Sequence, residues 1–435
     1  MNKFARRYAG LLATVIALCA PTASIAQAQA GKIIVLEHAD SLVGKVVEGE
    51  EARELIGSVA ISQEGVHISC DRALQLIARG TVYLTGNVIV RDDSMTLRAP
   101  RGVYHREDRR AEAFEDVLLD DGKVRVIARY GEYLVDPRKA FFRSGVYVAD
   151  STSVVGADSL TYWRDSRKSL GLGHVRVHSR SDNATVYGER LDHDGVRSYS
   201  RITGSPFLVQ LDTTDGRLDT LQVHGRVLEA FRDSSRRLIA TDSVRIVRSD
   251  LAAAGNFACY YLRGDSIYLR SHPVLWYRDT QVTGDTVNIY LRKRKLERLF
   301  VGGNAFAASR DDSLRLERVD QMTGDRLTMF FGDKGLRTLW LVGRAISLYH
   351  LYDDSLANGL NKTSGDRIVM NFAEGRAESI SVYGGVEGQY VPENLVAHRE
   401  AEYALPGFLW RADRPRITRF VPFVPPPELT RSFPR

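Results

Sequence analysis

Four acidic residues stand at similar places along the chain and suggest a ladder of carboxylates. Asp158 lies in "ADSL", while Asp285, Asp325 and Asp366 lie in "GDTV", "GDRL" and "GDRI". Paired carboxylates can act as general acid and base on glycosidic bonds. Each of these acids, however, directly precedes an alternating apolar stretch, where Asp side chains commonly accept hydrogen bonds from turn backbone. We interpret them as markers of turn-to-strand entries, and the sequence predicts no catalytic residue.

Two other patterns could bind metal ions. His174 and His178 fall on one face of an expected strand, but a zinc site needs at least a third protein ligand and none is suggested nearby. The stretch "DHDG" at 192–195 is typical of the start of a calcium loop, yet the later ligands are missing and a hairpin turn fits it better. The sequence therefore predicts neither a metal nor a cofactor.

The sequence also lacks the common catalytic signatures. No G-x-S-x-G, H-E-x-x-H, P-loop, G-x-G-x-x-G or paired C-x-x-C occurs in it. Cys70 and Cys259 lie far apart in the chain, which leaves a disulfide open, although two buried free thiols are favoured. We expect a protein that is not an enzyme.

One dense basic run, "LRKRKLERL" at 291–299, could contact an anionic ligand. Arg and Lys pair strongly with phosphate, so Arg292, Lys293, Arg294 and Lys295 are candidates for holding the phosphates of a lipid headgroup. The alternative is a solvated hairpin tip whose charge discourages edge-to-edge aggregation.

The first 30 residues have the features of a secretory signal peptide. A positive region containing Lys3, Arg6 and Arg7 precedes the apolar stretch "LLATVIALCA" (11–20) and the small-residue stretch "AQAQA" (26–30). We expect an exported protein, and lipidation at Cys19 stays open. Removing these three cations lowers the net charge from +6 to +3, a balance that predicts no nucleic-acid partner.

The strongest signal is a repeat of 29 residues. Val88, Val117, Val146 and Val175 share one phase of this repeat. Three further columns share the same spacing: Val90, Leu119, Val148 and Val177; Ala99, Ala128 and Ala157; Tyr104, Tyr133 and Tyr162. Within each unit, apolar residues alternate with others, which is typical of half-buried strands. Each unit therefore predicts one antiparallel hairpin, and stacked hairpins can share one interior.

The repeats cover most of the chain. We expect units of about 29–31 residues over 31–210 and units of about 30–41 residues over 211–391, about eleven hairpins in all. Eight of the thirteen prolines lie after residue 390, so 392–435 forms a Pro-rich tail that cannot continue the sheet. We expect this tail to be extended, and either mobile or pinned to a partner.

The repeated pattern of "GNVIV", a polar turn and "ADSLTY" resembles the LptA/OstA family of lipopolysaccharide-transport proteins. The segment "GSVAISQEGVHISCDRA" (57–73) is similar to the first repeat of the longer OstA-like members. The resemblance implies an all-β, extended antiparallel β-jellyroll whose groove carries acyl chains of lipopolysaccharide or a related glycolipid. It also implies a periplasmic location, possible outer-membrane association and contacts with other jellyroll proteins of the transport bridge at both membranes, or end-to-end self-association.

A lipid-carrying groove would use the inward positions of the repeats. These are Val88, Val90, Leu119, Val148, Leu160, Val175, Val177, Val287, Ile289, Leu327 and Met329. The same residues could instead pack together as a closed, purely structural β scaffold. A third alternative is an exported β-solenoid, a lyase or lectin acting on polysaccharide, whose repeats would be parallel coils.

The resemblance also predicts where partners dock. An open stack of hairpins leaves unpaired backbone groups at both ends. We expect these edges within 32–42, "KIIVLEHADSL", and near 378–391, "ESISVYGGVEGQYV".

Overall fold

The computed structural model describes residues 35–63, 66–91, 95–134, 137–214, 217–232, 234, 236–249, 251–292, 295–310, 318–333, 335–353, 356–373 and 376–429. The signal peptide expected over 1–30, with Cys19, lies outside these residues, as do residues 32–34 of the expected first edge and Lys293 and Arg294 of the basic run.

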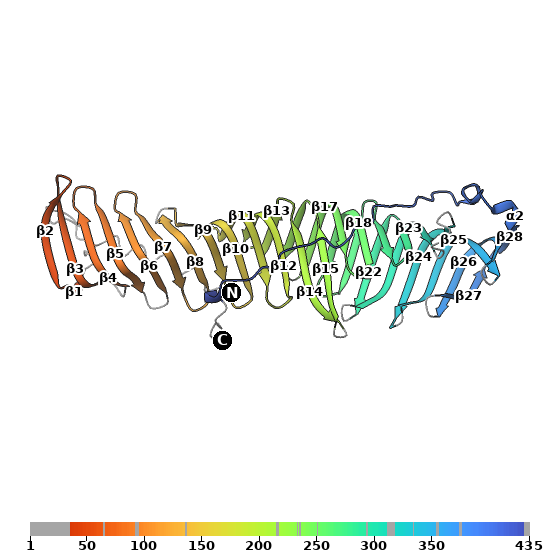
Figure 1. Ribbon diagram of the computed structural model, residues 1–435, viewed down its shortest axis with the longest axis horizontal. Helices are drawn as coiled ribbons and strands as arrows, with labels where there is room; N and C mark the ends of the chain where they lie inside the picture. The colour runs from red at the N-terminus through yellow and green to blue at the C-terminus, as the bar shows by residue number, and fades with distance from the viewer. Residues whose placement is uncertain are drawn as a thin grey trace. The chain divides into compact units, whose positions relative to one another are not determined.

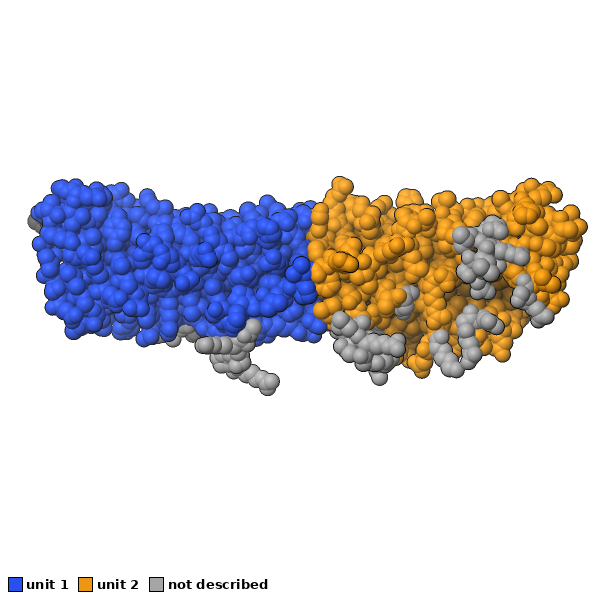
Figure 2. Space-filling view, in the orientation of Figure 1, with its two compact units in different colours: residues 1–204, 421–435 blue, residues 205–420 orange. Residues whose placement is uncertain are grey.

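The chain divides into two compact units, unit 1 with residues 1–204 and 421–435 and unit 2 with residues 205–420 (Figure 2). The strands of unit 1 are β1 (Val35–His38), β2 (Ser41–Val47), β3 (Glu50–Gln63), β4 (Val66–Leu76), β5 (Thr81–Arg91), β6 (Thr96–His105), β7 (Arg110–Asp120), β8 (Arg125–Leu134), β9 (Lys139–Ala149), β10 (Ser153–Trp163), β11 (Lys168–Ser179), β12 (Ala184–Asp194) and β13 (Tyr199–Thr203).

Unit 2 begins with β14 (Phe207–Thr214), β15 (Arg217–His224), β16 (Val227–Phe231), β17 (Arg237–Val247), β18 (Leu251–Tyr261), β19 (Ser266–Arg270), β20 (Val274–Tyr277), β21 (Thr280–Thr283) and β22 (Thr286–Arg292). It continues with β23 (Lys295–Ser309), β24 (Asp320–Gly332), β25 (Gly335–Asp353), β26 (Leu356–Ala373), β27 (Arg376–Tyr383) and β28 (Glu387–Pro392), followed by the short helices α2 (Glu393–Val396) and η2 (Glu400–Tyr403). A last 3-10 turn, η3 (Pro427–Leu429), belongs to unit 1.

Successive strands pair as antiparallel neighbours, as the hairpin repeat predicted (Figure 1). In unit 1, β5 pairs with β6 so that Val88 faces Ala99 across the ladder, and β9 pairs with β10 so that Val146 faces Ala157. Two of the columns seen in the sequence are therefore cross-strand partners. The predicted all-β, antiparallel fold is confirmed. Among the described residues, no helix is long and apolar enough to cross a membrane.

Every repeat contains one sharp bend, which we call the corner. A corner is a pair of successive residues with positive φ inside or between strands, such as Gly86 (φ 77°) and Asn87 (φ 47°) in β5. Apart from the tight hairpin turn Glu48–Gly49 between β2 and β3, eleven corners occur in the described residues, and their first residues are Gly57, Gly86, Glu115, Ser144, Gly173, Gly204, Asp242, Ser271, Gly303, Gly343 and Gly384. One corner per repeat agrees with the predicted eleven hairpins.

The corners fold each strand over its own interior. Leu84 and Val90 lie on either side of the β5 corner, yet both belong to one buried cluster with Val59 and Tyr104. The two halves of a strand therefore form facing layers with apolar side chains between them, which is the arrangement expected of a jellyroll.

The acidic residues of the sequence ladder lie beside the corners of neighbouring strands and do not cap hairpin turns. Asp158 sits against Gly173 of the next strand, and Asp325 sits in the same way against Gly343. A Cβ on either glycine would overlap the carboxylate. The prediction of turn-to-strand markers was wrong for Asp158, Asp325 and Asp366, which lie inside strands, whereas Asp285 directly precedes β22. Each acid occupies space that only a glycine in the neighbouring corner leaves free.

The Pro-rich tail is extended and lies on the chain's own strands (Figure 1). In unit 2, the buried amide of Gln281 donates to the carbonyl of Leu409 (2.7 Å) and accepts from the N–H of Arg411 (2.7 Å). Gln222 makes the same pair of bonds with Thr418 (2.7 and 2.8 Å). The tail is therefore held mainly through its backbone, which suits a segment rich in proline.

In unit 1, the tail continues on the outer face of the strands. Tyr187 donates to the carbonyl of Val421 (3.0 Å) and accepts from the N–H of Phe423 (3.1 Å). Leu429 is fully buried against Ala149 and Val154. Cys70 and Cys259 are buried free thiols, so the favoured interpretation is confirmed and no disulfide joins them.

Candidate functional site

The predicted groove residues of unit 1 all lie on the inner face, but at two depths. Val88 and Val175 are next to corners and are 2% and 1% exposed. Val90 and Leu160 are also buried. Leu119, Val148 and Val177 lie further from the corner, toward the ends of the strands, and are only partly buried. The apolar interior of unit 1 thus reaches solvent at the inner residues that lie further from the corner.

Three further inner residues, which the sequence did not predict, form a row with Leu119, Val148 and Val177. Leu97 pairs with Leu119, Val155 pairs with Val148 and Val177, and Val186 pairs with Val177. All three are partly buried aliphatic side chains. They could have been found by counting back across each hairpin turn, since residues opposite one another in an antiparallel ladder share a face.

The tyrosine column of the sequence faces this row from the other layer. Tyr104 packs with Val90 and Leu97, and Tyr162 packs with Val148 and Val155. Burial raises the pKa of the Tyr133 and Tyr162 phenols above the ordinary value. The interior of unit 1 is therefore lined by aliphatic residues on one layer and by neutral aromatic residues on the other.

The predicted groove residues of unit 2 are completely enclosed. Val287 and Leu327 are 0% exposed, and Ile289 and Met329 are 1% exposed. They continue into cross-strand rows of buried residues such as Val301 and Leu341. The structure places these four side chains in a closed core.

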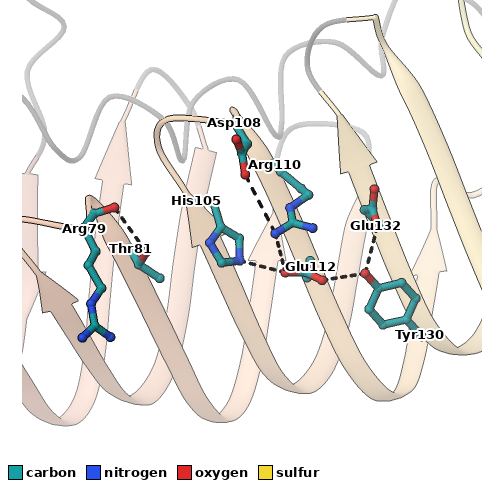
Figure 3. Close-up of polar contacts among 8 residues, drawn as sticks. All are labelled: Arg79, Thr81, His105, Asp108, Arg110, Glu112, Tyr130 and Glu132. Atoms are coloured by element: carbon teal, nitrogen blue, oxygen red, sulfur yellow. Dashed lines mark hydrogen bonds and ion pairs between the residues drawn. The ribbon is translucent and has the colours of Figure 1, made fainter.

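The polar cluster that most resembles an enzyme site lies on the outer face of β6, β7 and β8 (Figure 3). Glu112 receives hydrogen bonds from Tyr130 (2.6 Å) and His105 (2.8 Å), and Tyr130 also contacts Glu132 (2.9 Å). A second contact, between Thr81 and the carbonyl of Arg79, is drawn beside it (Figure 3).

The electrostatics of this cluster do not favour acid–base chemistry. Burial acts to raise the pKa of Glu112, but the hydrogen bonds from Tyr130 and His105 outweigh it and hold the pKa below the usual value. Burial, followed by the two carboxylate contacts, raises the pKa of Tyr130. The carboxylate stays ionised and the phenol stays protonated near neutral pH, so the cluster links strands rather than transferring protons.

The two histidines have separate partners. His174 lies at a corner and contacts Asp158 (2.8 Å), which raises the pKa of its imidazole, while His178 contacts the Thr185 hydroxyl (2.9 Å). In "DHDG", Asp194 accepts from the N–H groups of Val196 and Arg197 (both 3.0 Å), as expected of a hairpin turn. Within the described part of the chain, no group of three or more His, Cys, Asp or Glu side chains is arranged to hold a metal ion.

The described part of the basic run forms the ends of a hairpin. Arg292 pairs with Lys295 across the β22–β23 ladder, and the Arg292 guanidinium contacts Glu297. Phosphate binding by Arg292 and Lys295 stays a prediction.

The edges predicted from the sequence are edge strands in the structure. In unit 1, β1 and β2 both pair with β3, and Leu42 and Val46 of β2 are 62% and 71% exposed. In unit 2, β27 and β28 both pair with β26, and Ile380 and Tyr390 are exposed. Each unit therefore presents apolar side chains on a terminal strand.

Comparisons with known proteins show what the first part of the chain is similar to. Residues 31–185 match the family model described as "OstA-like protein". A search of curated proteins found no match. Among solved structures, the chain aligns with LptH from Pseudomonas aeruginosa, described as the LptA homologous periplasmic component of the conserved lipopolysaccharide transport device. That alignment has 16% identity and a TM-score of 0.25, and it covers 33% of this chain and 95% of LptH.

The match at 31–185 includes β1 to β11 and the partly exposed inner residues Leu119, Val148 and Val177. It confirms the resemblance predicted from the repeats. Residues 31–185 of this chain are therefore similar to OstA-like proteins.

Proposed function

We propose that this chain is a non-enzymatic, periplasmic carrier that holds the acyl chains of lipopolysaccharide or a related glycolipid between its β-layers. The observation that carries the proposal is the apolar inner row of unit 1, which is only partly buried at Leu119, Val148 and Val177 within an OstA-like segment. A lipid that crosses water needs such a continuous apolar surface and no reactive group.

The energetics of the row suit this task. Burying one methylene contributes about 0.8 kcal/mol, so ten methylenes contribute roughly 8 kcal/mol. That is comparable with a micromolar dissociation constant, about −8.2 kcal/mol, before the costs of binding. Aliphatic side chains such as Leu119 and Val148 bind chains of varying length, since the interaction has no directional requirement.

The polysaccharide-acting β-solenoid has less support. Such a protein consists of parallel coils, whereas the strand pairs of both units are antiparallel. The purely structural scaffold differs from our proposal only in whether lipid occupies the interior of unit 1.

The exposed edge strands support a place in a chain of similar proteins. We propose that β2 in unit 1 and β28 in unit 2 add strands from other lipopolysaccharide-transport jellyroll proteins, or from a second copy. Strand addition uses the unpaired backbone groups of an edge, and the apolar side chains of Leu42, Val46 and Tyr390 would be covered. An interface between unlike edges does not close, so it can bridge two membranes.

The test is photo-crosslinking to purified lipopolysaccharide. We expect a photoreactive residue at Val148 to capture lipopolysaccharide, because it faces the interior. Leu172 is the control, since it lies in the same sheet but is 40% exposed and its neighbour Gly171 lies against Leu191 of the interior. Tyr147 is less suitable as an outer control because it stacks on Phe423 of the tail.

Strong labelling at Val148 with little at Leu172 supports the carrier. Equal labelling of the two positions indicates adsorption to the surface, and no labelling at Val148 leaves the structural scaffold as the better account.

A further inference from the structure

The repeats allow equivalent positions of the interior to be compared. We define the mouth position as the residue four places after the first residue of a corner. In unit 1, Glu115, Ser144 and Gly173 begin corners, and the mouth positions are Leu119, Val148 and Val177. In unit 2, the corners at Asp242, Ser271, Gly303 and Gly343 give the mouth positions Ile246, Leu275, Ala307 and Ser347.

The two sets differ in exposure. Leu119, Val148 and Val177 are partly exposed. Ile246, Leu275, Ala307 and Ser347 are buried, with exposed fractions of 3%, 1%, 2% and 3%. Residues at the same distance from a corner therefore meet solvent in one part of the chain and are enclosed in another.

The cross-strand partners repeat this contrast. In unit 1, the partners Leu97, Val155 and Val186 are partly exposed, although Val126 is buried at 8%. In unit 2, Ala253 and Val282 pair with Leu275, and both are 0% exposed. Because several residues of each row differ in this way, the contrast does not depend on the rotamer of one side chain.

The change does not coincide with the unit limits. Ile61 and Val90, at the mouth positions of the first two repeats, are buried. Leu208 and Val223, in the first two strands of unit 2, are partly exposed. We call the partly exposed mouth residues of unit 1 and their partly exposed partners the open row, which begins at Leu97. From Ile246 onward the equivalent residues, up to Ser347, are enclosed.

Side-chain size gives a physical reason for the closure. The open row of unit 1 consists of Leu and Val, whereas the enclosed row of unit 2 includes Ala253, Ala307 and Ser347. Small residues allow facing layers to approach until the interior is filled at close-packed density. The two large mouth residues of the enclosed row, Ile246 and Leu275, each pair with Ala253, whereas pairs of the open row join only Leu and Val.

We propose that acyl chains bind along the open row of unit 1, and that the repeats from Ile246 to Ser347 are a closed core that carries no lipid. This inference rests on the proposed function and narrows it. The occupant is an acyl chain, because the open row is entirely aliphatic and the OstA-like match at 31–185 contains Leu97, Leu119, Val148, Val155 and Val177. The four groove residues predicted in unit 2, Val287, Ile289, Leu327 and Met329, then serve stability alone.

The test compares matched mouth positions in the full-length protein with purified lipopolysaccharide. Photoreactive residues are placed singly at Leu119 and Val148 in unit 1 and at Ala307 and Ser347 in unit 2. We expect labelling at the first two positions to exceed labelling at the second two by at least tenfold. Circular dichroism identifies any variant that fails to fold.

A second set of variants avoids a bulky probe in the closed core. Val148→Phe with Val177→Phe fills the open row and is expected to reduce bound lipopolysaccharide by at least fivefold, while Met329→Leu in unit 2 leaves it unchanged. Equal labelling at Val148 and Ala307 overturns the confinement but leaves the carrier function standing. So does an equal loss of bound lipid from the Val148→Phe, Val177→Phe variant and from Met329→Leu. Absence of labelling at all four positions, with no bound lipid in the parent protein, overturns both.

Discussion

At the scale of single residues, the corners couple an acid on one strand to a glycine on the next. Seven corners begin with Gly, and in each the space of the missing Cβ is taken by Asp or Glu, such as Asp71 beside Gly86. Where the residue at the position of the acid is not Asp or Glu, the corner begins with a residue other than Gly. The backbone N–H of Arg226 donates to the backbone carbonyl of Asp242, and that of Asn256 donates to the backbone carbonyl of Ser271. A repeat protein can thus vary each corner as a pair of residues.

This coupling predicts a graded series of stabilities. Gly44→Ala, in open space on an ordinary strand, should be neutral or stabilise by up to about 1 kcal/mol. Gly122→Ala, with φ 77° but open space, should cost about 1–2 kcal/mol for the backbone alone. Gly86→Ala has the same φ and also meets Asp71, so it should cost more. Urea unfolding measures these differences.

The double variant Asp71→Ala with Gly86→Ala separates the two causes. It should be about as costly as Gly122→Ala plus Asp71→Ala, because the overlap with the carboxylate is gone while the backbone strain stays. If Gly86→Ala costs no more than Gly122→Ala, the acid–glycine coupling is wrong.

At the scale of elements, the tail is a backbone-bound strap along the outer face of the strands. Gln222 and Gln281 are 0% and 3% exposed, and each makes two hydrogen bonds to the tail backbone. Pro-rich segments have few N–H donors, so the remaining ones, such as those of Arg411 and Thr418, are the ones that the strap uses.

Replacing both glutamines should release the strap. Gln222→Leu with Gln281→Leu removes four hydrogen bonds to the tail backbone and one from the Thr418 hydroxyl, worth roughly 0.5–1.5 kcal/mol each, and leaves backbone groups of the tail unpaired. We expect trypsin to cut after Arg416 and Arg419 at least tenfold faster, while the strands stay intact. Gln389→Leu, an exposed residue of β28, is the control. Unchanged cleavage in the double variant would contradict the strap.

Much of this element-level organisation could be predicted from the sequence. The 29-residue spacing gives the hairpins, and alternation gives the inner face of Val88 and Val148, because both depend on local residues. The closure of the core in unit 2 could not be predicted. It depends on the size of residues such as Ala253 and Ala307, whose packing partners, Leu275 and Val282, lie on other strands of the ladder. The position of the tail could not be predicted either, because the sequence does not link Gln281, or Gln321 at the equivalent position 40 residues later, to a distant Pro-rich segment.

At the scale of the whole molecule, the exposed edge of unit 1 should control association. Leu42 and Val46 lie on β2, which has β3 as its only partner among the described strands. Charges on an edge strand oppose strand addition. We expect Leu42→Glu with Val46→Glu to weaken self-association, or binding to a transport jellyroll protein, by at least tenfold in analytical ultracentrifugation.

The matched control is Leu356→Glu, which adds charge at a site 75% exposed near the start of β26. If it weakens association as strongly as the β2 variant, the effect is one of net charge, and docking at this edge is wrong.

The central claim is that lipid occupies the interior of unit 1, and its most direct measurement is mass spectrometry of lipid that co-purifies with the native full-length protein. We predict an acylated glycolipid in near-stoichiometric amount, and its loss from the Val148→Phe, Val177→Phe variant. A parent protein purified without detergent that carries no acylated lipid would contradict the account and leave a closed β scaffold.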